Sequence, residues 1–436
     1  MRQASRVSMR WSRSRRMLWC TAAVIALAAG DSAAQFDSGS TGADGALDFA
    51  ASPPGTVIDF DPTTFDPPLD PDGDGVYHFT TITIPANVTV KLRANKAGAA
   101  PVHWLAQGAV TIGGTLDLNG EAGHGASPAM PRVPSVPGPG GFGGGIGARV
   151  PNTPPQPGFG PGAGCVPNSG AGHATAGGDW NACLTNEPYG NAFLLPLIGG
   201  SGGGGGGSAG ADGAGGGAGG GAILIASSTS ISVSGIVRSN GGNNGGSGGG
   251  GGSGGAIRLV APTFGGAGGL TAAGGVGFRP GGVGRIRVET LQNTFTGTTS
   301  GDARATTLVP NPILLPTTPQ PQLKILTVDG VPVPPKPLGR FDMVDVMIDD
   351  AGPVDIVLEG HNIPLDATIT VTVINETEGT STSQTSPVPG TEELWNASVT
   401  MTFASGFSHI FTHAEWAPPP PAATPASSGA RTGGAR

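Results

Sequence analysis

The placement of glycine constrains this chain more than any other feature of its sequence. Of the 436 residues 80 are glycine, and the densest block, Gly199–Gly221, holds 16 of them in 23 positions. Two short apolar runs, Ala222–Ala226 and Ala256–Val260, each follow directly on such a block. This layout is typical of a repeat built from short strands and glycine segments, and it differs from that of an ordinary enzyme core.

The apolar runs also repeat at a fixed offset. Residues 102–120 match residues 223–241 after a shift of 121 positions, and looser copies begin at Ala256 and Gly284. Apolar residues recur at every second position within each copy, which is the period of a β-strand. The matched pairs are Val102 with Ile223, Trp104 with Ile225, Val110 with Ile231, Ile112 with Val233, Gly114 with Gly235, and Asn119-Gly120 with Asn240-Gly241.

A unit of this size cannot bury its few apolar residues alone, so we expect the units to stack and share one interior. The predicted fold class is mainly β, with a β-solenoid-like (parallel β-helix) glycine-rich domain over residues 35–309. The glycine blocks would serve as bends or lie close to a neighbouring segment, where a side chain has no room. Two alternatives stay open: the blocks form flexible loops, or they pack as polyproline-II-like strands.

A long insertion, residues 121–200, separates the first copy of the repeat from the second. It is rich in proline and glycine and contains Cys165 and Cys183. In an oxidising compartment these two cysteines would form a disulfide that closes the loop between them. We therefore expect a loop-rich flap on the stacked units, held by this disulfide.

The chain changes character after residue 309. Residues 310–322 form a proline-rich linker, and residues 323–416 contain five or more short strand-like runs without a helical period. This pattern predicts a small Ig-like β-sandwich, with Trp395 and Trp416 in its core. Residues 417–436 are rich in Pro, Ala, Ser and Gly and predict a disordered tail.

Residues 1–34 have the pattern of a signal peptide. Six arginines precede an apolar stretch, Met17–Gly30, and Ser32-Ala33-Ala34 provides the small residues of a cleavage site before Gln35. The apolar stretch is too short to span a bilayer, which takes about 20 residues. We expect a secreted or cell-surface protein, exported through the Sec pathway and without stable membrane insertion once the signal is cleaved.

The charge excludes some partners. The net charge is −8, and residues 1–34 hold six arginines and one aspartate, so the exported chain is more acidic still. Nucleic-acid binding needs a basic surface, and attraction to anionic lipid needs the same. We therefore expect no nucleic-acid partner; a glycan or another surface protein fits the composition better.

Two segments carry a resemblance to known proteins. They read GVYHFTTITIPANVTVKL (Gly75–Leu92) and PVHWLAQGAVTIGGTLDLNG (Pro101–Gly120), and glycine blocks follow them. With these features the chain resembles a group of uncharacterised exported bacterial glycine-rich repeat proteins. Residues 324–416, with VDGVPVPPKP and HNIPLDATITVTV, look like the Ig-like module that often ends them. The resemblance implies export and repetitive β structure, and it implies no activity and no catalytic residue.

The repeat itself offers little to acid–base chemistry. Between Ala222 and Thr290 the sequence has no Asp, His, Lys or Tyr, and Glu289 is its only acid. Polysaccharide lyases and hydrolases need clustered carboxylates or a calcium site with a basic partner. Asp117 and Glu121 could pair beside the first copy, although a solvated turn is the favoured interpretation. We therefore predict no catalytic residues.

No cofactor or metal site is predicted either. Glycine triplets of the dinucleotide-binding type abound in the blocks, but no helix follows them, so they carry no meaning here. Asp70, Asp72 and Asp74 resemble the start of a calcium loop, yet Thr81 stands where the bidentate glutamate belongs. The sequence leaves open whether these aspartates bind calcium.

Three aromatic residues of the insertion, Trp180, Tyr189 and Phe193, are the candidate ligand contacts. They could stack on sugar rings, or they could seal the flap against the stacked units. Two functions follow. The first is an exported non-catalytic surface or extracellular-matrix protein with a structural or adhesive role. The alternative is a carbohydrate-binding or carbohydrate-active protein, lyase-like or hydrolase-like, with its site on residues 121–200.

Overall fold

A computed structural model describes the chain from Phe36 to Trp416, with short gaps. Strands dominate, and the described residues contain only two short helices, η1 (Pro62–Thr64) and α1 (Ala94–Ala97), which confirms the mainly β prediction. The predicted signal peptide and tail lie outside the described residues. These are 36–71, 74–127, 132–150, 154–179, 182–207, 210–246, 248–309, 311–315, 321–335, 337, 344–349, 352–375 and 379–416.

Two parallel sheets are built by strands that alternate along the chain. The first sheet contains β1 (Leu47–Asp48), β4 (Ile82–Ile84), β7 (Val110–Ile112), β10 (Ser230–Val233), β12 (Ala256–Gly266), β9 (Ala222–Ser227), β6 (Val102–Ala106) and β3 (Val76–Phe79), with β14 (Arg285–Phe295) and β16 (Asp302–Thr307) beyond β12. The second contains β15 (Thr298–Ser300), β13 (Gly269–Thr271), β11 (Ile236–Arg238), β8 (Thr115–Asp117), β5 (Thr89–Lys91) and β2 (Val57–Asp59).

The first sheet bends back and nearly closes. Its long strand β12 pairs with β9 over Ala256–Val260 and with β10 over Thr263–Gly265. Pro262 lies between the two halves and has no N–H to give to a ladder, so the strand can change direction there. Each cycle of the chain thus passes through the two arms of this sheet and then through the second sheet, as β6, β7 and β8 do.

Strand pairing reproduces the offset of the sequence repeat. Val102 is the ladder partner of Ile223, and Trp104 is the partner of Ile225. Val110 pairs with Ile231 in the same way. The predicted stacking of the units is therefore confirmed at the level of single residues, because a parallel register places like residues above one another.

One apolar core fills the space between the parallel sheets. It includes Ile223, Ile257 and Leu259, each at most 1 % exposed. Toward the N-terminal strands the core is aromatic, and the ring of Trp104 lies 5.6 Å from Phe60 and 6.0 Å from Phe79. Burial of one such side chain contributes on the order of 2 kcal/mol, so the stacked units share a stabilisation that none could provide alone.

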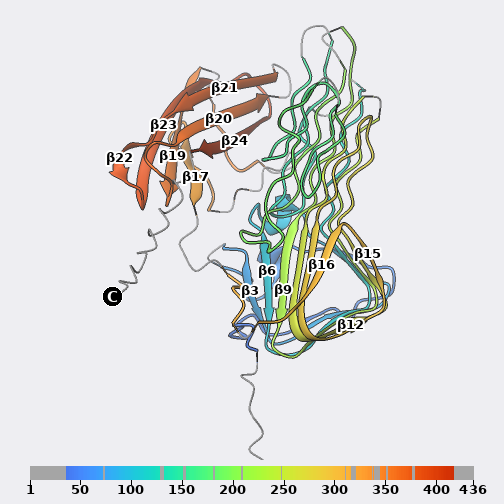
Figure 1. Cartoon of the computed structure of the whole chain (residues 1–436). Helices are drawn as coiled ribbons and strands as arrows, with labels where there is room; N and C mark the ends of the chain where they lie inside the picture. The colour runs from blue at the N-terminus through green and yellow to red at the C-terminus, as the bar shows by residue number, and fades with distance from the viewer. Residues whose placement is uncertain are drawn as a thin grey trace, which may run out of the picture. The chain divides into compact units, whose positions relative to one another are not determined.

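The glycine blocks form excursions from the parallel sheets. They lie between β8 and β9, between β11 and β12, and between β13 and β14. Within them the chain runs to and fro as extended segments, drawn as wavy green and yellow traces in Figure 1. We call each such segment, for example residues 213–221, a pass. These passes contain almost no regular strand, yet many of their glycines are buried.

Backbone hydrogen bonds hold the passes together with a three-residue period. Within residues 215–221, consecutive N–H groups donate to three different neighbouring passes in turn, over 2.8–3.0 Å. A three-residue turn with all bonds to neighbours is the geometry of polyproline-II-like chains. The pairs are Gly215, Ala218 and Gly221 to His124, Glu121 and Leu118; Gly216 and Gly219 to Gly145 and Phe142; and Gly217 and Gly220 to Gly250 and Ser253.

Close approach explains why these positions are glycine. A Cβ atom on Gly217 would lie 1.9 Å from the carbonyl oxygen of Gly242, and one on Gly219 would lie 1.8 Å from that of Gly200. No real side chain tolerates such distances. Of the roles predicted for glycine, close packing against neighbours is the one seen in these passes, in the polyproline-II-like form rather than as free loops.

The C-terminal region contains two antiparallel sheets that share one core. The first is β18 (Val331–Pro332), β17 (Gln322–Val328), β19 (Pro353–His361), β23 (Leu394–Thr402) and β22 (Val388–Thr391). The second is β21 (Gly379–Thr385), β20 (Thr368–Asn375) and β24 (Ser408–Glu415). Buried and exposed residues alternate strictly along β23, as expected when one face of a strand meets the core.

Only one of the two tryptophans assigned to this core lies in it. Trp395 is 1 % exposed, and its indole N–H donates to the carbonyl oxygen of Ile363 over 3.0 Å. Trp416, which follows β24, is 37 % exposed, so its assignment to the core is wrong. A tryptophan one residue beyond the last strand has no facing sheet to cover it.

Among the described residues, no helix has both the length and the apolar character that are needed to cross a membrane.

The glycine packing predicts that substitution cost depends on Cβ clearance. Gly217→Ala should destabilise the chain by about 2 kcal/mol or more, because a neighbouring pass must move to make room. Gly125→Ala is the matched control, since its Cβ would meet only the Gly245 oxygen at 3.6 Å. It should be neutral or stabilise by about 0.5 kcal/mol. Thermal unfolding measures both, and equal effects would contradict this account of the packing.

Candidate functional site

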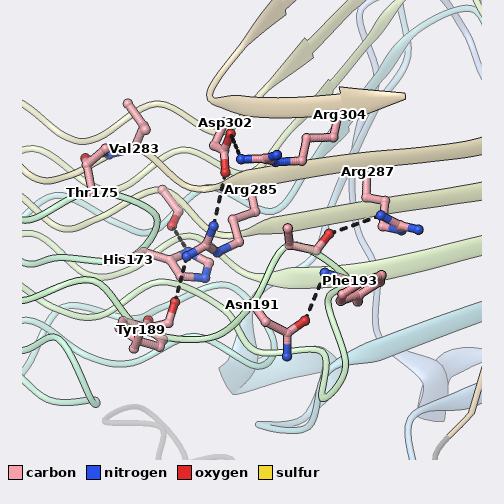
Figure 2. Close-up of polar contacts among 12 residues, drawn as sticks. His173, Thr175, Tyr189, Asn191, Phe193, Val283, Arg285, Arg287, Asp302 and Arg304 are labelled. Atoms are coloured by element: carbon pink, nitrogen blue, oxygen red, sulfur yellow. Dashed lines mark hydrogen bonds and ion pairs between the residues drawn. The ribbon is translucent and has the colours of Figure 1, made fainter. Parts of the chain in front are cut away.

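Two of the three predicted ligand contacts lie on a loop that crosses the outer face of β14. Figure 2 shows Tyr189 and Phe193 on this loop, beside the arginines of the sheet. Trp180, the third, lies outside the described residues. The loop belongs to the predicted flap, and the disulfide predicted for it, Cys165–Cys183, is present. Leu194 and Leu197 follow Phe193 and are buried in an apolar cluster with Leu224 on the outer face of β9.

Tyr189 is half-buried, and both its ring and its hydroxyl are engaged by the protein. Its ring stacks on His173 at 4.7 Å between centroids, with an interplanar angle of 24°. Its hydroxyl donates to the carbonyl oxygen of Gly199 over 2.5 Å and accepts from the Ser201 hydroxyl over 3.0 Å. Burial raises the pKa of this phenol well above its ordinary value. The side chain seals the loop against the glycine passes, and its ring and hydroxyl are both occupied.

Phe193 is placed differently. Its side chain is 62 % exposed, and the guanidinium of Arg287 lies 5.1 Å from the ring centroid. Arg287 also donates to the carbonyl oxygen of Ala192 over 3.4 Å. A cation–π contact at an exposed site contributes about 0.5–1 kcal/mol, which holds the ring in place while much of it faces solvent.

A buried charge cluster lies under this loop. Glu289 of β14 is 3 % exposed, and its Oε1 atom accepts from Arg258 over 2.8 Å and from Arg287 over 2.9 Å. The two arginines are ladder partners on β12 and β14, so the parallel register brings two positive charges together. Glu289 compensates both, because attraction between opposite charges is strong where water is excluded.

A second ion pair ties the loop to the edge of the sheet. Arg285 forms a 3.1 Å ion pair with Asp302 and donates to the carbonyl oxygen of Tyr189 over 3.0 Å (Figure 2). Arg304 lies on the other side of Asp302 at 3.5 Å. The carboxylates of this region therefore neutralise arginines and position the loop.

Asp117, interpreted from the sequence as part of a solvated turn, is buried instead. It is 2 % exposed and forms ion pairs with Arg238 at 3.0 Å and Arg93 at 3.7 Å. Arg238 is its ladder partner one strand away, and that neighbour in space is 121 residues distant in sequence. Glu121 pairs with Arg93 at 3.9 Å. The two carboxylates thus share a cation, and the turn assignment fails for Asp117.

Of the three aspartates considered for calcium, Asp70 serves the local turn. Its side chain is buried and accepts from the backbone N–H groups of Asp74 and Gly75, over 3.0 and 3.3 Å. Asp72 lies outside the described residues. Among those described, no three His, Cys, Asp or Glu side chains are grouped so as to hold a metal ion.

Sequence reasoning missed a polar groove on the glycine passes. A surface cavity of about 350 Å³ is lined by Asn119, Asn240 and Asn243 together with glycine and alanine. The signal was visible, since Asn119-Gly120 aligns with Asn240-Gly241 in the repeat. It could not be interpreted without knowing that the blocks lie side by side. A second cavity, of about 700 Å³, is lined by residues including Asp366, His413 and Trp416.

Comparison of the chain with models of known families, with curated proteins and with solved structures finds no match in any of the three. The resemblance to exported glycine-rich proteins therefore stays a prediction.

The charge cluster predicts unequal costs for two neutral substitutions. Glu289→Gln should destabilise the chain by about 3–5 kcal/mol, because it leaves the buried guanidinium of Arg258 and the half-buried one of Arg287 without a counter-charge. Asp302→Asn should cost about 1 kcal/mol or less, since the Asp302 side chain is 29 % exposed and water screens its ion pairs. Chemical denaturation measures the free energy of unfolding of both variants. Similar losses would show that Glu289 is not the group that stabilises the charge cluster.

Two buried histidines predict that stability falls in acid. Burial lowers the pKa values of His103 and His173 from 6.5 to about 4. Below pH 6.5 the two histidines become protonated in the unfolded chain, whereas in the folded chain they stay neutral down to about pH 4. The free energy of unfolding therefore decreases as the pH falls from 6.5 to about 4. The free energy of unfolding is measured by chemical denaturation at pH 7, 6, 5 and 4. His103→Gln and His173→Gln should each reduce the slope of this free energy against pH. An unchanged slope in both would contradict the assignment.

Proposed function

We propose that this chain is an exported, non-catalytic protein of a cell surface or extracellular matrix, with a structural and adhesive role. In this proposal the parallel sheets form a β-solenoid that carries a polyproline-II-like glycine bundle, and the C-terminal sheets form an Ig-like β-sandwich. Secretion follows from the pattern of residues 1–34. The disulfide Cys165–Cys183 supports an oxidising compartment.

The observation that carries the proposal is the hydrogen-bonded lattice of the glycine passes. Glycine loses more backbone freedom on folding than any other residue, so ordering long glycine segments is costly. Here successive N–H groups of one pass reach three neighbours, and the close approach excludes water from many of them. Such a lattice is stiff, and its chemistry is almost entirely that of backbone. Stiffness with little side-chain chemistry suits a spacer or an adhesive face better than a reaction centre.

The polar clusters support the same conclusion. The side chains best placed for acid–base work each have a structural partner: Glu289 neutralises two arginines, and Asp117 neutralises two others. Burial keeps His173 neutral near pH 7, and its Nδ1 lies 2.7 Å from the carbonyl oxygen of Gly254. These groups hold loops and strands in register.

A carbohydrate-binding role for the flap remains the second candidate, and Phe193 favours it. An exposed aromatic ring that is held from one side by Arg287 can stack on a sugar ring. Tyr189 does not add to this site, since its ring and hydroxyl are already engaged.

A binding screen tests the proposal. The chain from Gln35 onward is applied to whole cells, to extracted matrix and to a glycan array, and each glycan is also checked for chain cleavage. Retention without cleavage is the expected result. Deletion of residues 323–416 then locates the contact, because loss of retention would place it in the C-terminal sheets. Release of sugar fragments, or no retention on any of the three, would contradict a non-catalytic adhesive role.

A further inference from the structure

We propose that the asparagine groove, defined by Asn119, Asn240 and Asn243, binds a neutral polysaccharide chain. This inference rests on the adhesive function proposed above and names the ligand class and its site. The groove lies across three adjacent glycine passes, and the cavity along it measures about 350 Å³. Ala122 and Ala273 line it together with glycines.

The same asparagines that join the passes are held in fixed orientations. The side-chain oxygen of Asn119 accepts from the backbone N–H of Asn240 over 2.7 Å. That of Asn240 accepts from Ala273 over 2.7 Å, and that of Asn243 accepts from Val276 over 2.8 Å. Each amide is thus locked through its oxygen. Such locking lowers the ordering cost that a ligand would otherwise meet on binding.

The locked oxygens leave the amide NH₂ groups for a ligand. Within the described part of the chain these NH₂ groups make no hydrogen bond, although all three residues line the cavity. Asn240 and Asn243 lie three residues apart on one pass, which is one turn of a polyproline-II-like chain, or about 9 Å. The donors therefore recur along the groove, as the oxygens of a repeating polymer do.

The lining selects the class of polymer. Asn, Gly and Ala supply all nine of its residues, so an anionic chain would meet no cation in the groove. Along the groove the backbone N–H groups of Asn240 and Ala273 already bond to asparagine side chains. The hydroxyl and ring oxygens of a sugar accept hydrogen bonds from amide donors. These properties favour a neutral polysaccharide.

Two variants in the full exported chain test the site. Ala122→Trp fills the groove and leaves every asparagine in place. Asn243→Asp keeps the oxygen that accepts from Val276 and replaces the NH₂ donor. Dextran, galactomannan and soluble β-glucan serve as neutral probes, with alginate as the anionic comparison, in affinity electrophoresis and calorimetry. Each variant should weaken binding of a neutral probe about tenfold or more.

Matched controls separate the groove from general effects. Ala303→Trp places the same ring on an exposed position of β16, and Asn293→Asp changes another exposed asparagine whose oxygen accepts a backbone N–H, that of Phe295. Both controls should bind the neutral probe like the parent chain, and all four variants should keep the parent melting temperature within about 2 °C.

Four results would overturn the proposal. They are the absence of binding to every neutral probe, a preference for alginate, unchanged binding in either groove variant, and equal losses in the controls. The proposed function fails in a different way. A parent chain that adheres to cells or matrix but binds no neutral probe keeps its adhesive role and loses only the groove. A chain that adheres to nothing loses the role itself.

Discussion

The structure of the glycine region depends on one interaction, the backbone hydrogen bond between neighbouring extended passes. A polyproline-II-like chain satisfies none of its own N–H or C=O groups, so every one of them needs a neighbour or water. In this protein the neighbours come so close that a Cβ atom at many positions would fall within about 2 Å of a carbonyl oxygen, as at Gly217. Glycine is therefore the residue that permits the contact, and its large entropic cost is offset by bonding in several directions at once.

The parallel sheets supply the alignment that the glycine passes lack. A pass made mainly of glycine has little side-chain pattern to select one register over another. The first and last passes of each excursion, however, adjoin strands whose apolar residues stack in a defined register, as Val102 does on Ile223. Asparagine oxygens extend that alignment into the passes, since Asn119 bonds to the backbone of Asn240. Arg285 and Arg287, each paired with a carboxylate of the sheet, do the same for the loop that crosses β14, because they donate to its carbonyl oxygens.

Sequence reasoning could predict the stacked strands because alternating apolar residues leave a readable pattern. The sequence repeat is offset by 121 positions, and the same offset separates the ladder partners Val102 and Ile223. Two cysteines in one loop predicted the disulfide between them. The state of the glycine blocks could not be decided, because packed passes and free linkers have the same composition. Nor could the burial of Asp117, whose partner Arg238 is close only through the fold. The asparagine groove was missed for the same reason, while Trp180 lies outside the described residues.

The three glycine excursions share a place in the chain cycle, each leaving a strand of the second parallel sheet and returning into the first. The excursion between β8 and β9 is far longer than the other two, yet β9 still pairs directly with β6 of the preceding cycle, and β11 with β8. The length of a glycine excursion therefore does not affect how the strands of the parallel sheets stack. Because each pass repeats every three residues, whole triplets can be gained or lost without rotating the pass against its neighbours, whereas a single-residue change shifts its phase. Growth of such a protein in triplet steps would lengthen the bundle and leave its base intact.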